Sequence, residues 1–121
     1  MMVNRLQGKR AIVTGGSSGI GRAICNLFVT EGAALVIADI DSDGGLETLN
    51  EVLNNKGKAT FVHTDVSKAD SVENLISEAV DFMGGIDVLV NDAAAFVFGG
   101  LEDVTDEDWN KVFSVNVIGS A

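Results

Sequence analysis

Four short apolar runs alternate with stretches of helical periodicity, and this alternation leaves few folds open to the chain. The runs predict strands over Ala11–Val13, Leu35–Ala38, Thr60–Val62 and Ile86–Val90. They are almost continuously apolar, which is typical of strands covered on both faces. Strands that alternate with helices form parallel sheets with right-handed crossovers. The 121 residues therefore predict one α/β domain built on a parallel sheet.

A helical stretch follows each of the four runs. The first is expected to begin at Ile20 and to end at Gly32. The third opens with the capping-box pattern Ser67–Asp70 and ends at Gly84, and the fourth begins at Thr105. The apolar faces expected on the first three helices consist of Ile20, Ala23, Ile24, Leu27 and Phe28, then Leu46, Leu49 and Leu53, then Val72, Leu75, Ile76, Ala79 and Met83.

A polar residue follows each apolar run, at Thr14, Asp39, Asp65 and Asn91, with spacings of 25, 26 and 26 residues. That spacing is the length of one strand-plus-helix unit. In open parallel sheets, ligands bind beyond the carboxyl ends of the strands. The four polar residues are therefore expected to gather at one edge, where a ligand would bind.

The segment Thr14–Gly21 reads T-G-G-S-S-G-I-G and joins the first expected strand to the first expected helix. Glycine allows a tight turn and a close approach of the backbone to a ligand. The helix start beyond it offers unpaired N–H groups and a positive dipole end, which suit a pyrophosphate. Asp39 lies 18 residues after Gly21, where a carboxylate can accept hydrogen bonds from an adenosine ribose. Together these features predict a dinucleotide-binding turn.

Composition excludes several classes of function. The formal charge is −10, so the chain cannot neutralise a run of phosphates, which argues against nucleic acid and against an anionic membrane surface. No apolar run approaches the ~18 residues that span a membrane. The single cysteine, Cys25, cannot form an internal disulfide, and a reactive role is not expected for it. These features favour a cytoplasmic protein. His63 has no cysteine or second histidine near it, so no metal site is expected.

The turn at Thr14–Gly21 has the T-G-x-x-x-G-x-G spacing of the short-chain dehydrogenase/reductase family, and the chain resembles that family along its whole length. The resemblance implies a three-layer Rossmann-type parallel sheet, here with four strands in the order 3-2-1-4. It implies that Asp39 binds the adenine ribose and that Asp65-Val66 contacts the adenine ring. The fourth strand would have a bare edge, and an exposed apolar edge invites self-association, so a homo-oligomer is expected.

The resemblance extends to Thr105–Gly119, which is similar to the family's fourth-helix signature. In that signature Asn116 is the active-site asparagine. The implied cofactor-binding residues are Gly15, Ser17, Ser18, Gly19, Ile20, Gly21, Asp39, Ile40, Asp65, Val66, Asn91 and Ala93. Asp39 would repel a ribose 2′-phosphate, and neither Ser17 nor Ile40 supplies a cation for it, so NAD is favoured over NADP.

Two departures from the family pattern stand out. The N-N-A-G motif appears as Asn91-Asp92-Ala93-Ala94. The family's general acid is a tyrosine in a Tyr-x-x-x-Lys helix, and the chain contains no tyrosine. The resemblance therefore implies that residues 1–121 are the NAD-binding half of a longer enzyme, truncated on the C-terminal side. That parent would oxidise or reduce a small alcohol or carbonyl substrate, whereas this chain would bind NAD without turnover.

Alternatives remain open at this stage. Asp65 would also suit a plain turn, Asn91 would also satisfy loose backbone groups, and Asn116 would also suit a bend in a helix. An alternative for the whole chain is a non-catalytic NAD-binding or partner-binding module. A remote alternative is a calcium loop at Asp39–Asn50, which begins D-x-D-x-D-G but has Asn50 where a bidentate glutamate is needed.

Overall fold

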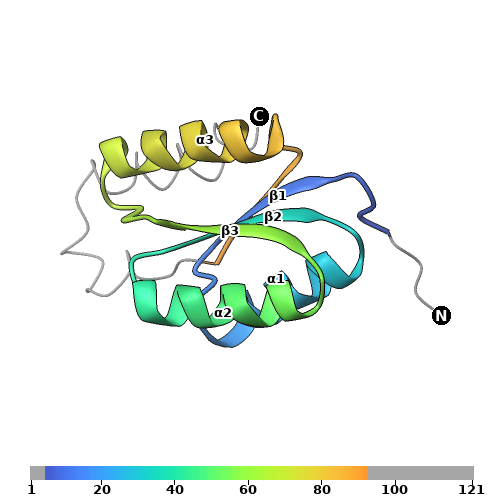
Figure 1. The fold of residues 1–121 in the computed structure, drawn as a ribbon. Coiled ribbons are helices and arrows are strands. Elements are labelled where there is room, and N and C mark those ends of the chain that lie inside the picture. The colour runs from blue at the N-terminus through green and yellow to red at the C-terminus, as the bar shows by residue number, and fades with distance from the viewer. Residues whose placement is uncertain (1–4, 93–121) are drawn as a thin grey trace.

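A computed structural model of the chain describes residues 5–92. The elements alternate strictly between strand and helix (Figure 1). In chain order they are β1 (Arg10–Thr14), α1 (Gly19–Thr30), β2 (Ala34–Asp39), α2 (Ser42–Asn54), β3 (Lys58–His63), α3 (Ala69–Met83) and β4 (Val88–Asn91). All four expected strands are present. β4 begins at Val88, two residues later than expected, because Asp87 is held by Arg10 before the strand starts.

The four strands form one parallel sheet in the order β3-β2-β1-β4. Figure 1 shows α1 and α2 together on one face of the sheet and α3 on the other. The predicted α/β fold, its three layers and its strand order are confirmed. Among residues 5–92, β4 pairs with β1 along one side only.

The core lies on both faces of the two central strands. Alternate residues of β1 point to opposite faces, so Val13 packs toward α1 and α2 whereas Ile12 packs toward α3. Both side chains are fully buried. This explains why the strand reads as continuously apolar, since neither face meets water.

The helices bury narrower stripes than the apolar residues of the sequence indicate. In α1 the buried residues are Gly21, Cys25 and Val29, whereas Ile20 is 72% exposed and Leu27 is 55% exposed. In α2 the buried residues are Gly45, Thr48 and Val52, and Leu46 and Leu53 are about half exposed. The expectation that Ile20, Ala23, Leu27, Leu46 and Leu53 are buried was therefore wrong. The close approach of α2 to the sheet decides its face, because a Cβ at Gly45 would collide with the ring of Phe61.

The observed helix ends agree with those predicted from the sequence, except at the start of α3. Gly32 follows α1 with φ +96°, and Gly84 ends α3 with φ +84°, both in the left-handed conformation that glycine favours. The capping box at Ser67–Asp70 was wrong: α3 begins after Lys68, and the Ser67 hydroxyl donates to Asp65 Oδ1 at 2.6 Å. Ser67 therefore belongs to the turn before the helix. The helix expected from Thr105 lies outside the described residues.

An ion pair joins the amino ends of β1 and β4. Arg10 Nε and Nη2 donate to the two carboxylate oxygens of Asp87 at 2.9 and 3.0 Å, and the Arg10 N–H also donates to Asp87 at 2.9 Å. These hydrogen bonds lower the pKa of Asp87 from 3.8 to about 2. The folded chain therefore favours the ionised carboxylate.

This pair predicts a specific acid sensitivity. Asp87 stabilises the fold fully above its unfolded pKa, and this stabilisation is lost as the pH falls from about 4 toward 2. In urea titrations, Asp87→Asn should be less stable than wild type at pH 6, and the gap should narrow at pH 3. Asp81→Asn removes an exposed carboxylate that makes no ion pair within residues 5–92 and should leave stability unchanged. An undiminished deficit of Asp87→Asn at pH 3 would contradict the prediction.

Candidate functional site

The carboxyl edge of the sheet brings the predicted polar residues together. Thr14 ends β1 and lies in register with Asn91 of β4 and with Ala38 of β2. The Thr14 side chain is fully buried, and its hydroxyl donates to Asn91 Oδ1 at 2.9 Å. Asp39 follows Ala38 at the same edge. The edge is thus tied together across three neighbouring strands directly beside the glycine-rich segment.

The glycine-rich segment is a tight turn between β1 and α1. Gly15 has φ +75°, and its N–H donates to the carbonyl of Ala38 at 2.8 Å. Gly21 lies against Gly15 in the first turn of α1, where a Cβ would collide with the Gly15 carbonyl oxygen. That position therefore requires glycine because of a close backbone contact.

The start of α1 has the features of an anion-binding site. Ser18 is the N-cap residue, its side chain makes no capping hydrogen bond, and the first turn holds no acidic residue. Space is open around Gly19, because a Cβ there would meet no atom within 4 Å. Helix N–H groups and the helix dipole favour a negative group at such an end. Ile20 is 72% exposed beside it and offers an apolar surface to a ligand.

Asp39 borders this turn. Its Oδ2 accepts a hydrogen bond from the Ser17 N–H at 3.1 Å, and its Oδ1 accepts one from the Asp41 N–H at 3.0 Å. Each carboxylate oxygen retains a further lone pair for a hydroxyl group. Ile40 follows and is 55% exposed. Asp39 therefore shapes the turn and stands at its rim.

The remaining predicted site residues are placed with mixed results. Asp65 lies in the loop after β3, and its Oδ1 accepts hydrogen bonds from the N–H and the hydroxyl of Ser67, as the turn alternative would require. Val66 beside it is half-buried. Ala93 and Asn116 lie outside the described residues.

Arg22 was missed by the sequence analysis although it contacts the turn directly. Its Nη2 donates to the Ser17 carbonyl at 2.6 Å, and its Nε donates to the Thr48 hydroxyl at 2.9 Å. The sequence contained a pattern that could have predicted these contacts of Arg22. Arg22 is the only basic residue between Arg10 and Lys56, and Glu47 and Glu51 share one face of the next helix.

The calcium alternative does not fit the structure. Residues Ser42–Asn54 form the helix α2, whereas a twelve-residue calcium loop needs an open coil there. Asp41 caps that helix by accepting the Gly44 N–H at 3.1 Å. Within residues 5–92, no group of three or more histidine, cysteine or acidic side chains is arranged to hold a metal ion. No helix in that range is long and apolar enough to cross a membrane.

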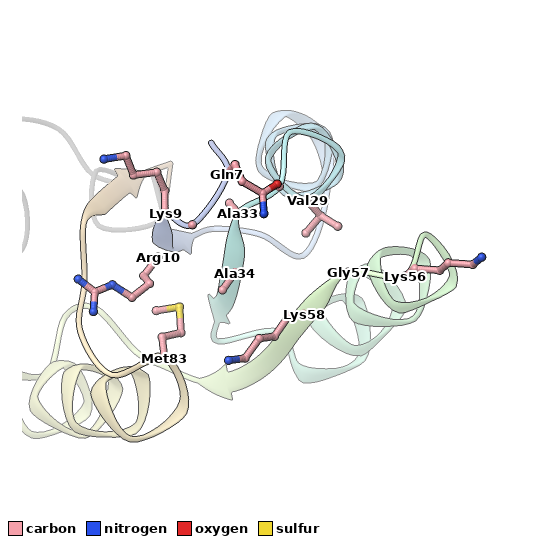
Figure 2. A pocket seen from close by; sticks show the side chains of 12 residues that line it. Gln7, Lys9, Arg10, Val29, Ala33, Ala34, Lys56, Gly57, Lys58 and Met83 are labelled. Carbon is pink, nitrogen blue, oxygen red and sulfur yellow. The ribbon is translucent and has the colours of Figure 1, made fainter. Parts of the chain in front are cut away.

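A hollow of about 460 Å³ lies at the opposite, amino edge of the sheet. Figure 2 shows that its cationic side chains do not converge: Lys9 and Lys56 point away from each other, and Lys58 lies between them. The Lys58 ammonium lies 5.4 Å from the centre of the Phe82 ring. The hollow therefore lacks the convergent polar groups of a ligand site.

Cys25 lies beneath the glycine-rich turn, and its thiol is inert by environment. The side chain is fully buried, and a Cβ at Gly16 would lie 3.2 Å from its Sγ. Burial, with a smaller contribution from the charge of Asp92, raises the pKa of the thiol to about 12. The reactive thiolate is therefore absent near neutral pH.

We expect Cys25 to resist alkylation in the folded chain. At pH 8 its reaction with iodoacetamide should be at least roughly 100-fold slower than in 6 M guanidinium, because labelling requires opening of the core. Mass spectrometry of timed samples measures both rates. Equal rates in the two conditions would mean that the thiol is accessible in the native fold.

Comparison with known proteins identifies the family to which this fold and its glycine-rich turn belong. The family model for short-chain dehydrogenases matches residues 9–121. The chain belongs to the short-chain dehydrogenase family. It is 44% identical to an uncharacterised oxidoreductase of Thermotoga maritima over 115 residues, which cover 94% of this chain and 44% of that protein. The chain thus spans less than half the length of this relative.

Two solved dehydrogenase structures are similar to the fold of this chain. A 7α-hydroxysteroid dehydrogenase in complex with NADH and 7-oxo glycochenodeoxycholic acid has a TM-score of 0.78 and 31% identity, covering 95% of this chain and 45% of that one. A short-chain dehydrogenase from Burkholderia cenocepacia in complex with NADP has a TM-score of 0.75 and 35% identity, covering 94% and 47%. Nicotinamide cofactors of both kinds therefore occur in structures similar to this chain.

The described residues of this chain fit the adenosine and pyrophosphate parts of such a cofactor. The turn leaves no room for a Cβ at Gly21, and the start of α1 beside it is uncapped by any side chain. An acidic residue borders the turn at Asp39. Asp92, the departure from the N-N-A-G motif, brings its Oδ2 to 2.9 Å from the position of a Cβ on Gly21. A second carboxylate therefore lies close behind the turn.

Proposed function

We propose that this chain binds NAD at the carboxyl edge of its sheet, as the cofactor-binding half of a longer NAD-dependent dehydrogenase. The supporting observation is the uncapped start of α1 behind a turn that only glycine can form, with Asp39 at its rim. Gly15, Ser17, Ser18, Gly19 and Gly21 would surround the pyrophosphate, and the N–H groups at the start of α1 would donate to it. Asp39 would accept the ribose hydroxyls.

The preference for NAD over NADP rests on charge. A 2′-phosphate would meet the Asp39 carboxylate, which repels it. Arg22 contacts the same turn, but Glu47 Oε2 at 3.2 Å and Glu51 Oε2 at 3.6 Å flank its guanidinium. Its donors are also bonded to Ser17 and Thr48. The guanidinium is therefore engaged and would not serve a second anion.

The remaining contacts would lie around the rest of the cofactor. Asp65 and Val66 would contact the adenine ring, and Ile20 and Ile40 would pack against the cofactor beside them. Asn91 and Ala93 would line the path toward the nicotinamide. The bound cofactor would supply hydride transfer to or from the carbon of a small alcohol or carbonyl compound. Asn116 would hold a water molecule in the associated proton transfer. The 121 residues include no tyrosine to act as the general acid, so we expect no turnover from this chain alone.

The side of β4 that has no strand partner within residues 5–92 and the single buried cysteine support two further proposals. An apolar strand edge paired along one side favours self-association, so we propose that this chain forms a homo-oligomer. A buried, unpaired Cys25 suits the reducing cytoplasm. The net charge of −10 supports neither a nucleic acid nor a membrane as a partner.

Fluorescence titration of the purified 121-residue chain with NADH, and then with NADPH, tests the proposal. We expect saturable binding of NADH and at least ~10-fold weaker binding of NADPH, the scale of one lost charge pair. Absence of NADH binding would refute the proposed site. A second candidate function is a non-catalytic NAD-binding module, which the missing tyrosine favours. NAD-dependent turnover by this chain that Gly19→Val abolishes would exclude that candidate.

A further inference from the structure

The Arg22 side chain joins the glycine-rich turn to α2. It extends from the first turn of α1, and its side chain is 28% exposed. Nη2 donates to the carbonyls of Ser17 at 2.6 Å and Gly44 at 3.2 Å. Nε donates to the Thr48 hydroxyl at 2.9 Å. One guanidinium therefore contacts both the turn that precedes its own helix and the first turn of the next helix.

Thr48 extends the same network into the core. Its side chain is fully buried, and its hydroxyl lies 2.7 Å from the carbonyl oxygen of Gly16, to which it donates. The carbonyls of two consecutive turn residues are thus fixed, that of Gly16 by Thr48 of α2 and that of Ser17 by Arg22 of α1. The sequence positions of Arg22 and Thr48 are 26 residues apart, so only the packing of α1 against α2 brings them together.

A fixed carbonyl also fixes the N–H group that follows it. The peptide unit is planar and trans, so its N–H points opposite to its C=O. The Gly16 carbonyl faces Thr48, and the Ser17 N–H on the other side donates to Asp39 at 3.1 Å. In the same way, the Ser17 carbonyl faces Arg22, so the Ser18 N–H points away from Arg22. This N–H has no hydrogen-bond partner within residues 5–92.

We propose that Arg22 is a positioning residue that holds the Ser17–Ser18 peptide with its N–H presented to the pyrophosphate. The inference rests on the proposed NAD site and adds a residue that touches no cofactor atom. Arginine suits the task because its planar fork donates from Nε and Nη2 to two fixed acceptors at once. Lysine carries the same charge on a single nitrogen and cannot reproduce that pair of directions.

The first arm of the test needs no cofactor. The orientation of the Ser18 N–H bond can be measured from residual dipolar couplings in the ¹⁵N-labelled chain, for wild type, Arg22→Met and Arg22→Lys. We expect Ser18 to reorient in both variants. The matched control is Arg10→Met, which removes another ion-paired arginine at the opposite edge and should leave Ser18 unchanged while lowering the melting temperature. Wild-type couplings in both Arg22 variants would overturn the inference.

The second arm measures affinity for NADH and for adenosine. Arg22→Met should weaken NADH by roughly 10-fold, the effect of losing one charge-assisted contact, and leave adenosine within about 2-fold, since adenosine carries no pyrophosphate. Equal losses for both ligands would indicate a general structural role and overturn the inference. If Arg22→Met does not fold, the affinities of Arg22→Lys for NADH and for adenosine test the inference in its place. A wild-type chain that binds no NADH would refute the proposed function, and the amide orientation would then decide the inference alone.

Discussion

Gly21→Ala should abolish measurable NADH binding and strongly destabilise the fold. A Cβ at this position would overlap the carbonyl oxygen of Gly15 and lie 2.8 Å from its carbonyl carbon. Both are backbone atoms of the turn, so relief requires the turn to move away from α1. Overpacking of this kind costs about 3 kcal/mol when backbone must shift. We expect NADH affinity to fall by roughly 100-fold or more, because the displaced N–H groups no longer converge on one ligand.

The control for this substitution is Gly8→Ala. Gly8 has φ +77°, and a Cβ there would meet no atom within 4 Å. It should therefore cost only the strain of the left-handed backbone, about 1–2 kcal/mol, without any change in NADH affinity. Thermal melts and NADH titrations of both variants make the comparison. Normal NADH binding by Gly21→Ala would mean that the turn does not hold the cofactor.

Asp39→Asn should remove the discrimination between NADH and NADPH. The substitution keeps the shape of the side chain but removes its charge, and it replaces one of the two oxygens that accept from Ser17 and Asp41. We expect the affinity for NADH to fall by roughly 10-fold through the lost backbone and ribose contacts. The affinity for NADPH should stay equal or rise, because the repulsion of its 2′-phosphate disappears. Parallel titrations with the two cofactors give the ratio.

Asp41→Asn is the matched control. It removes the same charge two residues away, and asparagine still caps α2 as well as aspartate does. Its ratio of NADH to NADPH affinity should stay close to that of wild type. If Asp41→Asn and Asp39→Asn change the ratio equally, the effect comes from overall charge and not from a contact of Asp39 with the ribose.

The fold was readable from the sequence because the two central strands, β1 and β2, are covered on both faces. Ala11–Val13 and Leu35–Ala38 could be recognised as buried strands without knowledge of their neighbours. The helix faces were not readable to the same degree. α1 and α2 carry more apolar residues than the sheet can cover, and the side that packs is set by small residues such as Gly45, which admits Phe61. Apolar periodicity records the large side chains and overlooks such contacts.

The candidate site was likewise predictable from the sequence only in part. The glycines of the turn and Asp39 are separated by fixed distances along the chain, so their meeting at the carboxyl edge was predictable. Arg22 and Thr48 were not, because their contact depends on the distance between two helices packed on the same face. The capping box failed for a local reason: Ser67 bonds to Asp65 two residues earlier, which competes with capping of the next helix.

The central position of β1 has a consequence for how the chain folds during synthesis. β1 pairs on one side with β2, which follows within a few tens of residues, and on the other side with β4, whose Asn91 is 77 residues from Thr14. Contacts of such long separation form late, because loop-closure entropy opposes them. A nascent chain can assemble β1, β2 and β3 first, which leaves Ala11, Ile12 and Val13 along an open edge. We expect this interval, before β4 is made, to be the period when the young polypeptide aggregates most readily and depends most on chaperones.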